Sequence, residues 1–140
     1  MKKVLIFLLA ISAFVSSCEK GDGPGPELKR QTELKLIGRW QLEKHTSQEY
    51  EPITTIKNTN EYTGTADDYY TFKTSNKVEI GAAPNSKIEV DYEVINPNQV
   101  WIHDKAWRII EHANARLTLH EDRYDVSNNK RYVTTIYLKR

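Results

Sequence analysis

The chain has 140 residues, of which 20 are Lys or Arg and 19 are Asp or Glu, and its formal net charge is +1. This balance argues against a nucleic-acid partner, because proteins that bind nucleic acids carry a clear basic excess on one face. The single cysteine, Cys18, leaves no intrachain disulfide and no thiolate metal site. A chain of this length forms one domain whose stability comes from packing.

The N-terminal segment has the composition of a secretory signal. Lys2 and Lys3 precede an apolar stretch, residues 4–15, and two small residues follow it, Ser16 and Ser17. A membrane-spanning helix needs about 20 apolar residues, so this stretch is too short to be one. We therefore interpret residues 1–17 as a cleaved signal peptide.

Residues 15–18, Val-Ser-Ser-Cys, resemble the lipobox of bacterial lipoproteins. The resemblance implies cleavage before Cys18 and lipidation of its sulfur, for example with palmitate. It also implies attachment to the cell envelope, most simply to the outer membrane on its periplasmic or outer face. The alternative is an ordinary secretory signal followed by an unrelated cysteine. Removal of Lys2 and Lys3 with the signal changes the net charge from +1 to −1.

Two short segments connect Cys18 to the rest of the chain. Residues 18–26 are rich in glycine and proline and have little apolar surface, which predicts a flexible tether. Residues 27–37 contain good helix formers and precede Gly38, which predicts one short helix. The folded domain is expected to occupy residues 27–140.

Most of the chain after the helix has the pattern of β-strands. Residues 87–95 alternate apolar with acidic side chains, which is the period of a half-buried strand. Asn96-Pro97-Asn98 then predicts a turn. The other predicted strands are residues 39–46, 69–74, 77–80, 100–104, 106–112, 115–121 and 131–139.

These eight strands have short polar turns and no crossover helices, which predicts an all-β, antiparallel, up-and-down arrangement. Closure into an eight-stranded barrel removes exposed strand edges, and a two-sheet sandwich is the alternative. The polar segment from 47 to 67 lacks a strand pattern, so we expect a long loop or lid there.

The motif Gly38-Arg39-Trp40, just after the helix, resembles the Gly-x-Trp signature of the lipocalins. The same resemblance to bacterial lipocalin-like lipoproteins is carried by Tyr70-Thr71-Phe72, Trp107-Arg108-Ile109-Ile110, Leu117-Thr118-Leu119 and the terminal Tyr137-Leu138-Lys139-Arg140. It implies a lipocalin-like barrel in which Trp40 closes one end. It also implies an arginine packed on that tryptophan, either Arg131 or Arg140.

The resemblance predicts a small apolar or amphipathic ligand inside the barrel, bound by Phe72, Tyr92 and Trp107. Trp40 and these three rings fall on inward-facing positions, and each can bury some 150–250 Å². We therefore expect either a filled interior or a small cavity at the open end, beside residues 47–67.

The second hypothesis is a solid barrel that docks an envelope protein or a glycan through its loops or outer face. Trp101 has the opposite parity to Val100 and Ile102, which predicts a tryptophan exposed on the outer face. It could contribute to a stacking surface with Tyr62, Tyr69 or Tyr124, or pack under the long loop.

Metal, cofactor and enzyme chemistry are not expected. His103, His112 and His120 fall on successive predicted strands, opposite the apolar face. A predicted tight turn at Asp104-Lys105 pairs His103 with Ala106, so His112, six residues further along that strand, lies about 20 Å away at ~3.3 Å per residue, too far for shared metal coordination. The acidic pairs Asp67-Asp68 and Glu121-Asp122 would point to opposite faces on strands. The loop acids Asp122 and Asp125, with Asn128 and Asn129, lack the spacing of a calcium loop.

Overall fold

The computed structural model describes residues 25–113 and 115–140. The predicted signal peptide, Cys18 and the tether up to residue 24 lie outside the described residues. Within them, one helix precedes nine strands. These elements are α1 Pro26–Leu36, β1 Gly38–Tyr50, β2 Ile56–Thr63, β3 Tyr69–Phe72, β4 Lys77–Ala82, β5 Ser86–Asn96, β6 Gln99–Ile102, β7 Lys105–Ala113, β8 Arg116–Asp125 and β9 Lys130–Lys139.

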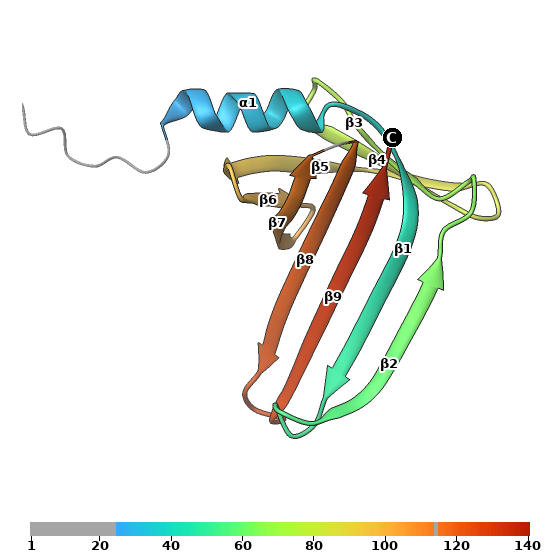
Figure 1. Cartoon of the computed structure of the whole chain (residues 1–140), viewed down its shortest axis with the longest axis vertical. Coiled ribbons are helices and arrows are strands. Elements are labelled where there is room, and N and C mark those ends of the chain that lie inside the picture. Colours follow the sequence, from blue (N-terminus) through green and yellow to red (C-terminus); the bar gives the residue numbers. More distant parts are fainter. Residues whose placement is uncertain (1–24, 114) are drawn as a thin grey trace, which may run out of the picture.

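The strands form a closed antiparallel barrel, as the sequence predicts. Neighbouring strands follow the order β1, β3, β4, β5, β6, β7, β8, β9, and pairing of β9 with β1 closes the ring of eight. Figure 1 shows α1 lying across one end of the barrel, while β8, β9, β1 and β2 run beyond the other strands as an extended sheet. The sandwich alternative is therefore wrong, because a sandwich would leave β1 and β9 unpaired with each other.

The core lies inside this ring and consists almost entirely of inward-facing apolar side chains. The alternation is clear in β5, where Tyr92 and Val94 are buried beside exposed neighbours. The four rings predicted to face inward are all buried: Trp40, Phe72, Tyr92 and Trp107. Phe72 and Tyr92 meet edge to face with centroids 5.0 Å apart.

One end of the barrel is closed by α1 and the C-terminus. Leu36 is fully buried, and its carbonyl accepts a hydrogen bond from Trp40 Nε1 at 2.7 Å. The Arg140 guanidinium lies 4.0 Å from the centre of the Trp40 ring and donates hydrogen bonds to the carbonyls at the end of α1. Of the two candidates, Arg140 is therefore the arginine on Trp40, whereas Arg131 lies in the extended sheet.

Gly38 has a backbone conformation that this closed end requires. Its φ is +118°, a region that side-chain-bearing residues rarely adopt. A Cβ at this position would also lie 3.2 Å from Arg140 Nη2. Glycine therefore lets the chain turn from α1 into β1 directly beneath the arginine.

The prediction of a long loop between residues 47 and 67 is wrong. β1 continues to Tyr50, and residues 56–63 form β2, which pairs back on the second half of β1. All eight side chains of β2 are exposed, so the strand has no buried face and no alternating apolar pattern to reveal it. Its backbone pairing with β1 holds it in place instead.

The prediction that three histidines lie opposite the apolar face is wrong for His112. The register of β7 against β8 shifts between Ile109 and Glu111, which makes Ile110 a bulged extra residue. His112 therefore lies opposite Leu117 on the inner face, and its ring packs 5.8 Å from that of Trp40.

The turn between β6 and β7 is displaced by one residue from its predicted position. Ile102 pairs with Lys105, so His103 and Asp104 form the turn, and His103 has a left-handed φ of 58°. His103 therefore lies at the rim of the barrel rather than in a strand.

Candidate ligand-binding site at the open end of the barrel

The end of the barrel opposite α1 contains a hollow of about 260 Å³. Trp107 forms part of its wall and is 7% exposed, whereas Ile88 lies at its mouth and is 57% exposed. The remaining apolar lining comes from the inner faces of β3, β4, β5 and β6: Tyr70, Ile80, Val90 and Ile102. No lining residue comes from residues 47–67, so the expectation that this segment flanks the cavity is wrong.

Charged and polar groups lie at the rim of the hollow, in the turn between β6 and β7. His103, Asp104 and Lys105 belong to its lining. The Lys105 side chain is about half exposed, and its ammonium lies 3.8 Å from a Glu121 carboxylate oxygen. This loose pairing leaves a cation available beside an apolar hollow.

Two titratable groups near the hollow are held in their neutral forms. Burial and the nearby positive charge of Lys105 both lower the pKa of His45, so this imidazole is neutral at neutral pH. Burial raises the pKa of the Tyr70 hydroxyl to about 12, so it stays protonated. The inner part of the lining is uncharged, which suits an apolar group, and the charged residues Asp104 and Lys105 lie at the rim.

A bulge in β1 marks where the apolar interior ends. Leu42 lies opposite Leu138, but the register then shifts, so that His45 lies opposite Ile136. The extra residue is Glu43, and beyond it the inward positions of β1 become polar, with Ser47 next. Beyond this bulge the inner face of β1 is therefore polar.

The structure separates the three predicted ligand-binding residues. Trp107 lines the hollow. Phe72 is 1% exposed and packs on Tyr92 within the core, and the Tyr92 hydroxyl donates to the Lys73 carbonyl at 3.1 Å. Phe72 and Tyr92 thus fill the barrel interior away from the open-end hollow.

The aliphatic part of the lining was not predicted from the sequence. Ile80, Ile88 and Val90 come from alternating segments that were recognised as strands, so their inward parity was available. What the pattern could not give was their position along the barrel axis. That position depends on the register between β4 and β5, which pairs Ile80 with Ile88.

Asp68 has a structural role that the sequence did not reveal. Its side chain is buried, and one carboxylate oxygen accepts hydrogen bonds from the Tyr62 hydroxyl and from the backbone and hydroxyl of Thr65, all at 2.7 Å. The other oxygen accepts from the Ala83 amide at 3.2 Å. These hydrogen bonds, of which the one from Tyr62 has the largest effect, hold the pKa of Asp68 well below its usual range. Asp68 therefore links β2 to the turn after β4.

The other acids and bases singled out in the sequence also make local contacts. Asp122 accepts two hydrogen bonds from Arg131, and Asp125 accepts three within its own turn, from Ser127 and Asn128. His120 meets the Thr135 hydroxyl at 3.1 Å on the outer face. Among residues 25–113 and 115–140, no three His, Cys, Asp or Glu side chains form a group that could hold a metal ion.

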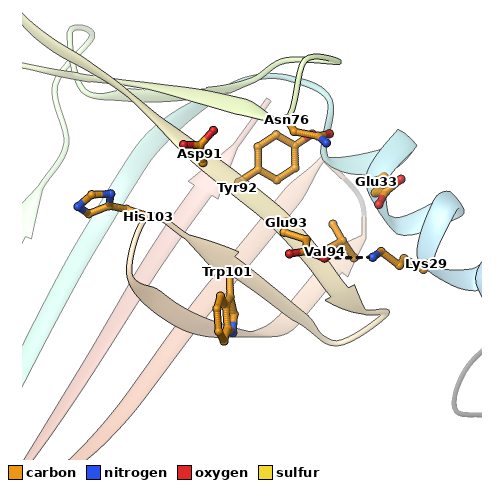
Figure 2. A pocket seen from close by; sticks show the side chains of 9 residues that line it. All are labelled: Lys29, Glu33, Asn76, Asp91, Tyr92, Glu93, Val94, Trp101 and His103. Atoms are coloured by element: carbon orange, nitrogen blue, oxygen red, sulfur yellow. Dashed lines mark ion pairs between the residues drawn. The ribbon is translucent and has the colours of Figure 1, made fainter.

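A second hollow lies on the outer surface, between α1 and the β5–β6 hairpin. Figure 2 shows its lining side chains, with Lys29 and Glu33 contributed by α1 and Trp101 by β6. It holds about 350 Å³, and a Lys29–Glu93 ion pair of 3.5 Å crosses it. Trp101 is 51% exposed, as its parity predicts. The lining contains none of the tyrosines proposed to accompany it.

Within the described part of the chain, no helix is long and apolar enough to cross a bilayer. The resemblance to the lipocalins stays a prediction, carried by the sequence motifs and compatible with the barrel. No family model, curated protein or solved structure matches this chain.

Proposed function

We propose that this is a lipid-anchored, lipocalin-like protein of the cell envelope that binds a small apolar or amphipathic molecule. The observation that carries the proposal is the hollow of about 260 Å³ at the open end of the barrel, with Trp107 in its wall. Ligand sites are concave and mostly apolar, with a few polar groups that fix orientation. The apolar lining and the charged rim fit that description.

The volume of the hollow restricts the class of ligand. Sites for drug-sized ligands hold about 300–1,000 Å³, and this one is smaller. Trp40, Phe72 and Tyr92 fill the rest of the interior. A short apolar chain or a single ring fits this space, and an anionic head group on it would meet Lys105 at the rim.

A fluorescence titration tests this site. We expect octanoate and octanol to change the emission of Trp107 saturably, because either apolar tail would displace water from beside its ring. The Trp107→Phe variant should lose the signal, while Trp101→Phe should keep it. Replacement of Lys105 by glutamine should weaken the binding of octanoate without affecting the binding of octanol, because only octanoate has a negative charge that can pair with Lys105.

A matched pair of isoleucines provides the control. Ile88→Arg places a charge at the mouth of the hollow and should abolish binding of octanol. Ile110 is equally exposed, at 55% against 57% for Ile88, but lies outside the hollow. Ile110→Arg should therefore bind as the original chain does. Equal binding by the two variants, or submicromolar binding of a long-chain lipid, would contradict a small ligand at this site.

The lipid anchor is tested separately. Two or more acyl chains attach a protein stably to a membrane, whereas one gives only marginal binding. We therefore expect Cys18→Ala to move the protein from the membrane fraction to the soluble fraction, measured by immunoblotting after a high-salt wash. A variant that stays membrane-bound would show that the lipobox resemblance is accidental.

The exposed Trp101 favours a second candidate function, an interaction module that docks an envelope protein or a glycan. An exposed tryptophan beside carboxylates such as Glu93 can stack on a sugar ring while the acids accept its hydroxyl hydrogen bonds. This function predicts that envelope oligosaccharides change the emission of Trp101 and that Trp101→Ala abolishes the binding. It also predicts that Ile88→Arg has no effect.

We propose binding without catalysis in either case. The acidic pairs that could act as acid and base are committed elsewhere, since Asp68 accepts four hydrogen bonds and Asp122 is paired with Arg131. Glu121 lies near the rim cation Lys105, apart from Asp122, which faces outward with Arg131.

A further inference from the structure

The barrel closes, but the extended sheet still has an unpaired edge along β2. Among the described residues, β2 pairs only with β1, so the backbone groups of its other edge have no strand partner. Figure 1 shows β2 as the outermost strand of the extended sheet. An unpaired edge presents a row of N–H and C=O groups that can template another strand. With 8 residues, β2 offers a longer edge than the mean strand of about 5–6.

The sequence of β2 is complementary to itself in the antiparallel direction. Residues 56–62 read Ile-Lys-Asn-Thr-Asn-Glu-Tyr. A two-fold axis through Thr59 places this residue opposite its own copy. Asn58 of each chain then lies opposite Asn60 of the other. All of these side chains are exposed, so they are available to a second chain.

The outer positions of the same register also match. Lys57 of one copy lies opposite Glu61 of the other, and Ile56 lies opposite Tyr62. The two-fold symmetry repeats each pair, which gives two opposite-charge pairs and two apolar pairs. Directly opposed residues are the ones that stabilise a strand pair, and opposite charges and aromatic–β-branched pairs are favourable combinations.

Neighbouring registers lack this match. An axis through Asn60 would place Lys57 opposite Thr63, and Glu61 opposite Thr59. An axis through Asn58 leaves Glu61 without a partner in β2. Of these three registers, only the one with its axis through Thr59 places Lys57 of one copy opposite Glu61 of the other.

From this free, self-complementary edge we propose that the protein forms a symmetric dimer through β2, with a second copy of this chain as the partner. The dimer joins the two extended sheets into one continuous antiparallel sheet. A two-fold interface uses the same surface on both subunits, which is what a self-complementary strand provides. The formal net charge of +1 offers little repulsion between copies.

Two local features bear on the strength of this pairing. Lys57 and Glu61 already have partners within the chain, Glu51 and Lys44, but both ion pairs are largely exposed and can be exchanged. The register against β1 also shifts between Glu49 and Tyr50, so β2 bulges at Lys57. The interface is small, and small interfaces are weak and transient.

A disulfide test reads the register directly. Opposed residues in an antiparallel pair have Cα atoms about 4.5–5.5 Å apart. That separation is within the roughly 4.4–6.8 Å that a disulfide requires. In the full chain carrying Cys18→Ala, Thr59→Cys should therefore give a disulfide-linked dimer under mild oxidation. Thr63→Cys is the matched control, because two copies of this exposed threonine would lie ~26 Å apart at about 3.3 Å per residue.

Charge reversal tests the chemistry of the same pairing. Either Lys57→Glu or Glu61→Lys should raise the dimer dissociation constant several-fold in sedimentation equilibrium, and the double variant should restore it. Reversal of both charges makes the intrachain contacts with Glu51 and Lys44 repulsive, so only pairing between chains can explain the rescue. A mass that stays monomeric up to millimolar concentration would overturn the proposal. So would equal crosslinking of the Thr59→Cys and Thr63→Cys variants, or no rescue in the double charge variant.

Discussion

Replacement of Trp40 by alanine is expected to lower the free energy of unfolding by about 3–5 kcal/mol, the cost of a cavity the size of a large aromatic side chain. Trp40 is 2% exposed and closes the barrel between α1 and Arg140. Stability of a domain is only about 5–15 kcal/mol, so the variant should melt roughly 10 °C or more below the original chain.

Two variants isolate the origin of that loss. Trp40→Phe keeps most of the ring and removes the N–H, and the Leu36 carbonyl still accepts from Arg140 at 3.2 Å. We therefore expect a cost nearer to one hydrogen bond, about 1 kcal/mol, plus a small packing loss. Trp101→Ala removes a half-exposed tryptophan and should change stability by at most about 0.5 kcal/mol. Equal melting temperatures for Trp40→Ala and Trp101→Ala would exclude Trp40 from the core.

Replacement of Asp68 by asparagine is the second large expected effect. Asp68 is 4% exposed, and its carboxylate is the shared acceptor for Tyr62, Thr65 and Ala83. Asparagine has one acceptor oxygen, so its NH₂ group must face at least one of these donors. Hydrogen bonds to a charged group contribute about 1.5–3 kcal/mol, and the substitution removes the charge that these donors share. We therefore expect the free energy of unfolding, measured by chemical denaturation, to fall by about that amount. The adjacent Asp67 is exposed, so Asp67→Asn should be neutral.

The pH dependence of the stability difference shows whether Asp68→Asn destabilises the protein by removing the charge or by changing the hydrogen-bonding geometry. Because the pKa of Asp68 is lowered in the folded state, its ionisation contributes stability above the unfolded value of about 3.9. That contribution is lost as the pH falls through the lower folded value. The stability difference between the original chain and Asp68→Asn should therefore be full near neutral pH and shrink below about pH 4. A difference that stays constant into acid would show that the charge of Asp68 contributes nothing.

Eight of the nine strands and the inward placement of the large rings could be predicted because both follow from local alternation. In residues 87–95, Glu89, Asp91 and Glu93 separate the apolar side chains at positions 88, 90, 92 and 94, so local alternation alone shows which face is apolar. Trp101 is predicted outward by the same rule and is exposed. Such predictions need no knowledge of which strand lies next to which.

The sequence could not reveal β2 or the inward turn of His112. β2 has polar side chains on both faces, and only hydrogen bonding to β1 makes it a strand. His112 faces Leu117 because Ile110 bulges, and a bulge depends on the pairing with β8. Alternating inward and outward positions counted from Trp107 therefore place His112 on the wrong face, because the count does not include the bulged residue Ile110.

The sequence by itself determined an all-β domain with one short helix, its inward rings and a near-neutral charge, because these depend on composition and on neighbours along the chain. Only the tertiary structure decided that Arg140 rather than Arg131 packs on Trp40, and that Trp107 rather than Phe72 lines the open-end hollow. It also decided that a buried carboxylate, Asp68, ties β2 to the barrel. Each of these depends on strand register and closure, which bring together residues far apart in the chain and which no local pattern encodes.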